Sequence, residues 1–202
     1  MHRKRHGGGL TDPIAERVNE DARAAKSALD RGCAEDLARV ERFLAGPLSD
    51  AQTRMRDQIA SLGDVGSDLR KSLLVESAGA IAQECWRRVF DNVALRFRVR
   101  FLLYAGDLEK AEERFHSQTR SPIATRRKPR RTIVPRIEAP EVPTLVLDYE
   151  PTESIATGFT AQLERYLREA IALEVRRERE VLVRRGTRNL ARARIALDLN
   201  PP

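Results

Sequence analysis

Apolar and small residues recur at intervals of three or four residues over the first quarter of the chain, from Ile14 to Leu44. This spacing is that of one face of an α-helix. Asp12-Pro13 is a favourable start, because the aspartate can cap the helix and the proline lacks an N–H that would be unpaired there. The stripe keeps its phase through Gly32, so one bent helix and two abutting helices both fit. Gly46-Pro47 is expected to end it.

A second helix is expected directly after that break. Ser49–Gln52 has the spacing of a capping box, and it precedes an apolar stripe between Met55 and Leu62. Gly63 and Gly66 then bracket a turn, after which Ser67 or Asp68 can cap the next helix.

The stretch 95–104, "LRFRVRFLLY", fits two periods. Alternation of apolar residues with arginines is typical of a strand, whereas its aromatic residues have helical spacing. The helical stripe starts earlier, at Trp86, and reaches Leu108, and no strong turn signal precedes Leu95, so we predict a helix. Gly106 is then expected to end it and Asp107 to cap the next one. The helical stripe consists of Phe90, Val93, Phe97, Phe101 and Tyr104.

On such a helix, the arginines of this region would not form a single array. Arg88, Arg96 and Arg100 share one face at spacings of eight and four residues, whereas Arg98 lies on another. The 88/96/100 face is read as solvated surface.

The segment "YAGDLEKAEERF", Tyr104 to Phe115, is similar to the turn between the two helices of a tetratricopeptide unit, with Gly106 and Ala111 at matching positions. The resemblance implies a helical hairpin and, in that family, stacked repeats that form a peptide-binding groove. It covers these twelve residues, and no second copy follows at an offset of about 34 residues. An ordinary helical hairpin is the alternative.

The chain changes character after His116. Residues 117–137 contain no acid, and three prolines there prevent a continuous helix. More prolines follow around the short apolar run Leu145–Leu147, so residues 117–151 are predicted to be an extended arm. A last helix of about 30 to 45 residues is expected from Thr152, with an apolar stripe starting at Ile155 and an acid-free, arginine-rich stretch from Val181 to Leu197.

The predicted fold class is therefore all-α, with an N-terminal helical bundle, an extended basic arm and a long C-terminal helix. The domains are a basic tail (1–10), the bundle (11–116), the arm (117–151) and the C-terminal helix (152–202). The formal net charge of +7 belongs to the two ends, since residues 11–115 hold 17 lysines and arginines against 19 acids. Charged residues make up 33% of the chain and aromatic residues only 5%, which favours helices with an aliphatic core.

The search for catalytic chemistry gives no recognisable motif. The histidines His2, His6 and His116 lack metal-ligand spacing, and Cys85 beside Trp86 reads as a buried structural thiol, because a nucleophile needs a neighbouring base. No cofactor, metal or small-molecule substrate is predicted, and the chain is expected not to be an enzyme. Two widely spaced cysteines, the lack of a signal peptide and the lack of a membrane-length apolar run predict an intracellular protein, or one inside a particle.

The clustered arginines carry the functional hypothesis, because guanidinium groups pair with phosphates and their clustering strengthens binding through counterion release. Few aromatic residues accompany them, so the phosphate backbone is the expected contact, with an acidic protein as the alternative partner. The apolar run is expected to dock on a partner subunit. The predicted anion-contacting residues are Arg120, Arg126, Arg127, Lys128, Arg130, Arg131, Arg136, Arg184, Arg185, Arg188, Arg192 and Arg194, and the predicted docking residues are Leu145, Val146, Leu147 and Tyr149.

Together these features predict a non-enzymatic subunit of a larger homo- or hetero-oligomeric assembly, such as a virion component or a nucleoprotein. Capsid, connector and ribonucleoprotein subunits share this plan of compact helices and basic arms, by analogy. A tetratricopeptide-like adaptor that binds a peptide is the second hypothesis, and an enzyme without a readable motif is the third.

Overall fold

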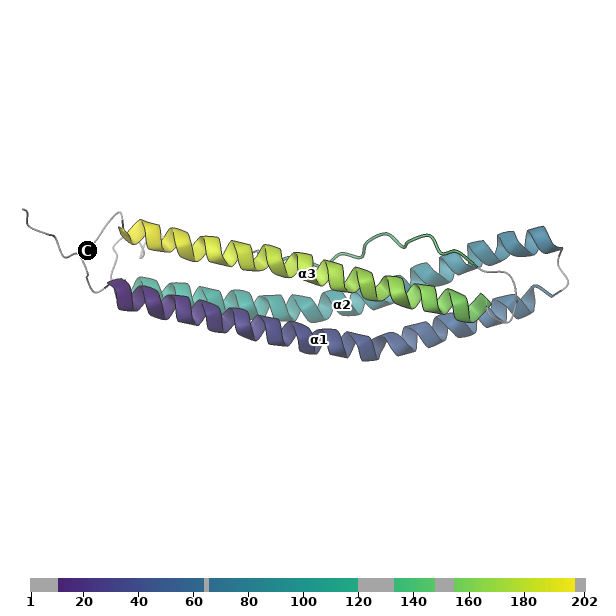
Figure 1. Ribbon diagram of the computed structural model, residues 1–202, viewed down its shortest axis with the longest axis horizontal. Coiled ribbons are helices and arrows are strands. Elements are labelled where there is room, and N and C mark those ends of the chain that lie inside the picture. The colour runs from purple at the N-terminus through teal and green to yellow at the C-terminus, as the bar shows by residue number, and fades with distance from the viewer. Residues whose placement is uncertain (1–10, 64–65, 120–132, 148–154, 199–202) are drawn as a thin grey trace, which may run out of the picture. The chain divides into compact units, whose positions relative to one another are not determined.

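The computed structural model describes residues 11–63, 66–119, 133–147 and 155–198. Over these residues the protein is all-α, with three helices and no strand (Figure 1). Helix α1 spans Thr11–Ser61, α2 spans Ser67–Thr119 and α3 spans Ile155–Asp198. The predicted fold class and the long C-terminal helix are confirmed. The basic part of the predicted arm, residues 120–132, lies outside the described residues, as does Thr152.

Helix α1 does not end at Gly46-Pro47, so that prediction is wrong. Pro47 lies inside one continuous helix, and Gly32 does not divide the helix either. The ring of a proline clashes with the Cβ of the preceding residue in a helix, and Gly46 has no Cβ. Pro47 and Leu48 are both buried, so tertiary packing offsets the hydrogen bond that Pro47 cannot donate.

The stretch 95–104 is helical, as predicted. Phe97 and Phe101 are completely buried in α2, whereas Leu95 is 66% exposed. Alternating residues therefore do not share a face, and Arg98 is exposed on a side of the helix away from the core.

The expected break at Gly106 and cap at Asp107 are wrong, because α2 runs without interruption from Ser67 to Thr119. The hairpin implied by the tetratricopeptide resemblance and the ordinary helical hairpin are therefore both wrong for this segment. Leu108 and Ala111 continue the buried stripe beyond the glycine. Burial of that stripe outweighs the ~1 kcal/mol that a glycine costs inside a helix.

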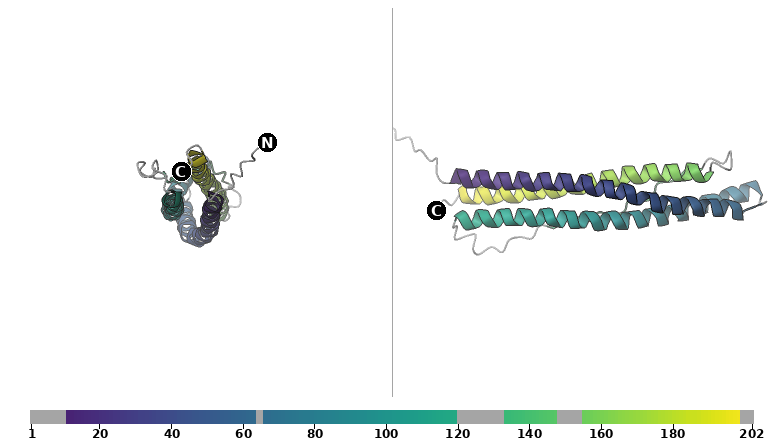
Figure 2. Two further views of the ribbon diagram at one scale, coloured as in Figure 1. Left: turned by 90° about the vertical axis from the view of Figure 1, so that its left-hand side faces the viewer. Right: turned by 90° about the horizontal axis from the view of Figure 1, so that it is seen from below.

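The chain divides into two compact units, each built from parts of all three helices. Unit 1 comprises residues 1–34, 98–135 and 178–202, and unit 2 comprises residues 35–97 and 136–177. Each of the three ribbons is nonetheless continuous along its own length (Figure 2).

In unit 1, α1 packs antiparallel to α2. Asp21 near the start of α1 accepts a hydrogen bond from Arg114 near the end of α2, at 3.0 Å. Farther along α1, Gly32 lies against the guanidinium of Arg100, which a Cβ at position 32 would overlap. The core of this unit includes Leu29, Phe101, Tyr104, Leu108 and Leu182.

In unit 2, the same antiparallel order is maintained by ion pairs of α1 with its neighbours. Arg88 of α2 donates to Asp50 at 2.6 Å, and Arg168 of α3 pairs with Glu41. The largest buried side chains in this unit include Leu44, Met55, Phe97, Phe159 and Leu163.

An irregular segment of unit 2, residues 136–147, packs on α2 and α3. Trp86 of α2 donates its indole N–H to the carbonyl oxygen of Pro140 at 2.8 Å. The side-chain amide of Gln162 on α3 accepts from the backbone N–H of Val146 at 3.2 Å and donates to its carbonyl at 2.6 Å. Ile137 and Leu147 are buried.

The direction of α3 explains why so long a connection precedes it. Helix α2 begins in unit 2 and ends in unit 1, and α3 does the same. The chain must therefore return from unit 1 to unit 2 before α3 can start. A helical hairpin joins antiparallel neighbours, and it cannot make this connection.

Candidate functional site

The arginine-rich part of α3 presents three of the predicted contact residues to solvent. Arg184, Arg185 and Arg188 are all exposed, and all three belong to unit 1. The helix continues through Gly186, so Arg184 and Arg188 lie one turn apart on the same face.

The opposite side of α3 is fixed by close packing on α2. Gly186 is buried, and a Cβ there would overlap Cδ1 of Leu108. Leu182, one turn earlier, is completely buried. Since successive residues are about 100° apart around a helix, Arg184 and Arg188 lie about 160° and 200° from Gly186. Packing of the glycine thus turns this arginine face outward.

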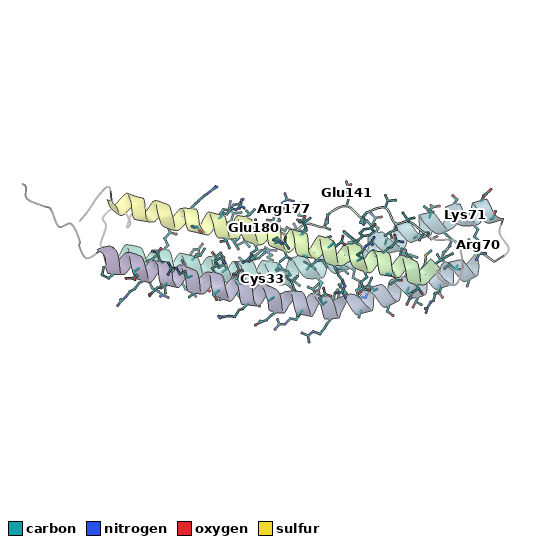
Figure 3. The ribbon with its side chains drawn as sticks, in the orientation of Figure 1. Cys33, Arg70, Lys71, Glu141, Arg177 and Glu180 are labelled. Atoms are coloured by element: carbon teal, nitrogen blue, oxygen red, sulfur yellow. The ribbon has the colours of Figure 1, made fainter. Side chains whose placement is uncertain are left out.

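Within this region the acidic neighbour is Glu180, which Figure 3 labels on α3. Arg184 donates to Glu180 at 3.3 Å, and the arginine side chain is 71% exposed. An exposed pair of this kind contributes about 0.3–0.5 kcal/mol. No acid occurs from Val181 to Leu197, so the face keeps its positive charge.

Arg179, at the start of the unit 1 part of α3, has a different role. Its Nε donates to Asp30 of α1 at 2.8 Å, and Lys26 donates to the same carboxylate at 2.9 Å. Burial opposes ionisation of Asp30, but the hydrogen bonds from Lys26 and Arg179 outweigh it and hold the pKa of that carboxyl below its ordinary value. Arg179 therefore joins α1 to α3. Burial, and then the negative charge of Asp30, raise the pKa of the nearby Tyr104 hydroxyl.

The other predicted contact residues are not brought to this face by the described structure. Arg136 is exposed on the segment 133–147 and belongs to unit 2. Arg192 and Arg194 lie within the bounds of α3, but their side chains are outside the described residues. The following residues of the basic run lie wholly outside them: Arg120, Arg126, Arg127, Lys128, Arg130 and Arg131.

The predicted docking run is divided between interior and surface. Leu147 is buried against its own chain, Leu145 is half-buried, and Val146 is 71% exposed. The two hydrogen bonds from Gln162 hold the backbone of Val146 with its side chain outward. Tyr149 lies outside the described residues.

A groove in unit 2 was not anticipated from the sequence. It has a volume of about 680 Å³ and lies between α2 and residues 139–147. Its α2 wall is made by small residues followed by Trp86, whose ring lies 5.4 Å from that of Phe90. Glu141 on the other wall points away from the helices (Figure 3). A signal was present in the sequence, namely the three alanines and one glycine among residues 78–82, one turn before the tryptophan.

A smaller cavity of about 360 Å³ in unit 2 is lined by Cys85 and by the Asp50–Arg88 pair. Burial raises the pKa of the Cys85 thiol to about 11. The thiol is therefore protonated at neutral pH, and its burial matches the predicted structural role.

Within the described residues, no group of three or more histidine, cysteine or acidic side chains is arranged to hold a metal ion. In the same part of the chain, no helix has the length and apolar character that crossing a membrane requires. Comparison with models of known families, with curated proteins and with solved structures gives no match.

Proposed function

We propose that this protein is a non-enzymatic helical subunit of a larger assembly, and that it contacts the phosphate backbone of a nucleic acid through the arginine face of α3. The observation that carries the proposal is the outward presentation of Arg184, Arg185 and Arg188 on a helix whose opposite side is locked against α2. Because the helix is already formed, binding of phosphates orders the arginine side chains but not the backbone, which lowers the entropy cost.

The contact is to the backbone and carries no base readout. Arginine forks pair with phosphate oxygens bidentately, and each neutralised phosphate releases condensed counterions. The basic run of residues 126–131 adds five charges from sequence alone. Binding is accordingly expected to be insensitive to nucleic-acid sequence and strongly sensitive to salt.

Purification with and without nuclease tests this function. The expected result is that the purified protein carries nucleic acid, seen as an elevated ratio of absorbance at 260 to 280 nm, and that nuclease lowers both this ratio and the mass from light scattering. A protein free of nucleic acid at low salt, with a mass that nuclease leaves unchanged, would contradict the proposal.

A second candidate function, a helical adaptor that binds an extended peptide, is favoured by the groove in unit 2. One wall of this groove is an irregular, proline-containing segment of the chain itself, which the Trp86–Pro140 hydrogen bond holds on α2. Docking of a proline-containing segment on aromatic side chains is a common mode of peptide recognition.

Trp86 is the sole tryptophan of the chain, so its fluorescence reports on the groove. A synthetic peptide with the sequence of residues 136–147 is expected to change the emission of the Gln162→Ala variant, in which the native segment has lost its contacts at Val146. Emission that stays constant up to millimolar peptide would exclude the adaptor function.

A further inference from the structure

The unit 1 part of α2 carries a second apolar face that its own core does not use. Val99, Leu102 and Leu103 are 54%, 51% and 59% exposed. Their spacings of three and four residues place them side by side on the helix, on the side opposite Phe101 and the rest of the core stripe. Three large apolar residues gathered on one exposed turn indicate an interaction surface.

The charges around this face change sign along the helix. Arg98 lies before the stripe and is exposed, whereas Asp107 and Glu109 follow it, and Asp107 pairs with the exposed Lys110 at 3.6 Å. Gly106 lies between the stripe and the acids, and a Cβ built on it would have no atom within 4 Å. The face thus has Arg98 at one end, a leucine pair at its middle, and the open space at Gly106 followed by Glu109 at the other end.

A face with this order of charges complements itself when two helices run antiparallel. With the two-fold axis between Leu102 and Leu103, Val99 of each helix lies opposite Gly106 of the other. At about 100° and about 1.5 Å per residue, Arg98 of each helix then lies on the same side of the contact as Glu109 of the other helix. The two residues are also at nearly the same position along the helix axis. A parallel pairing would instead leave Arg98 of one helix and Glu109 of the other eleven positions apart, about 16 Å along the axis, so that they could not pair.

We infer that this face of α2 binds the same face of a second copy of the chain in antiparallel orientation. The contact is isologous, because each copy supplies the same residues. Leu102 and Leu103 pack at the centre, and the Arg98–Glu109 pairs close its edges. The inference is independent of the proposed nucleic-acid contact on α3, and nuclease-treated protein is used throughout its test.

The mass of the full chain in solution is the first measurement. Over a hundredfold rise in protein concentration, the mass measured by light scattering is expected to increase from the monomer mass of 22.9 kDa to twice that value. The double variant L102E/L103E should stay monomeric with an unchanged helical circular dichroism spectrum. Leu173→Glu, the same change at an equally exposed leucine of α3 in unit 2, should dimerise like the wild type. A dimer that survives L102E/L103E, or a wild type that is monomeric throughout, overturns the inference.

Charge reversal tests the orientation. Arg98→Glu and Glu109→Arg are each expected to weaken dimerisation about tenfold, and the double reversal R98E/E109R should restore it. Within one chain these residues are eleven positions apart, or about 16 Å along the helix, so such a rescue must occur between chains. A double reversal that is weaker than both single variants overturns the antiparallel arrangement.

Disulfide trapping adds a measurement that does not depend on affinity. A mixture of Val99→Cys and Gly106→Cys chains should crosslink on oxidation, whereas each variant alone should crosslink much less. The open space at Gly106 lets cysteine fit there without displacing a neighbour. Preferential crosslinking of Val99→Cys with itself would indicate a parallel contact and contradict the inference.

Discussion

At the scale of single residues, Phe97 and Leu95 lie two positions apart and have opposite environments. Phe97 is completely buried and Leu95 is 66% exposed. Phe97→Ala should lower the free energy of unfolding by about 3–5 kcal/mol, because it removes a buried ring and leaves a cavity. Leu95→Ala should change it by less than about 0.5 kcal/mol. Urea unfolding followed by circular dichroism measures both, and comparable losses at the two positions would argue against the helical register of α2.

Cys85 gives a prediction about pH. Burial raises its pKa to about 11 from an ordinary value of 9.0, so the unfolded chain loses this proton at a lower pH than the folded protein does. The stabilising effect is complete below about pH 9 and is lost as the pH rises towards 11. Over that window the free energy of unfolding should fall more steeply for the wild type than for Cys85→Ala, which shares every other titrating group. Parallel curves for the two proteins would show that Cys85 has an ordinary pKa.

At the scale of elements, the helical stripes were readable from the sequence and the helix ends were not. The stripe from Phe90 to Tyr104 identified the buried face of α2, because burial of a repeating apolar face is a local and periodic signal. Gly46-Pro47 and Gly106-Asp107 look like helix boundaries because glycine, proline and a capping aspartate are also local signals. At both places packing on the other helices keeps the helix continuous. The strength of that packing depends on residues far away in the sequence, and a single sequence does not reveal it.

Helix α1 therefore contains a proline that it tolerates at a cost. Pro47→Ala restores the backbone hydrogen bond to the carbonyl of Phe43. The gain is partly offset by the greater freedom of the unfolded chain and by the packing that the buried proline ring loses. The free energy of unfolding should rise by about 1 kcal/mol. Pro13→Ala serves as the control, because Pro13 lies in the first turn of α1, where no such bond is lost. Thermal unfolding that shows no gain for Pro47→Ala would mean that α1 is broken at this position.

At the scale of the whole molecule, the candidate site was partly predictable. The arginines at 184, 185 and 188 follow from composition and helical spacing, and the structure adds the reason for their exposure, which is the packing of Gly186 on Leu108. The use of Arg179 to hold Asp30, 149 residues earlier in the chain, could not be inferred. The same is true of the groove, which depends on contact between Trp86 and Pro140, 54 residues apart.

The salt dependence of nucleic-acid affinity tests the central claim most directly. The affinity for a labelled duplex is measured by fluorescence anisotropy between about 50 and 200 mM salt, where each phosphate contact contributes about 0.9 to the slope of log affinity against log salt. The triple variant R184Q/R185Q/R188Q should flatten this slope by about two to three units. The matched variant R17Q/R23Q/R56Q removes the same charge from exposed positions on α1 and should leave the slope nearly unchanged. Equal slopes for the two triple variants, or no binding by the wild type at low salt, would contradict a nucleic-acid contact at α3.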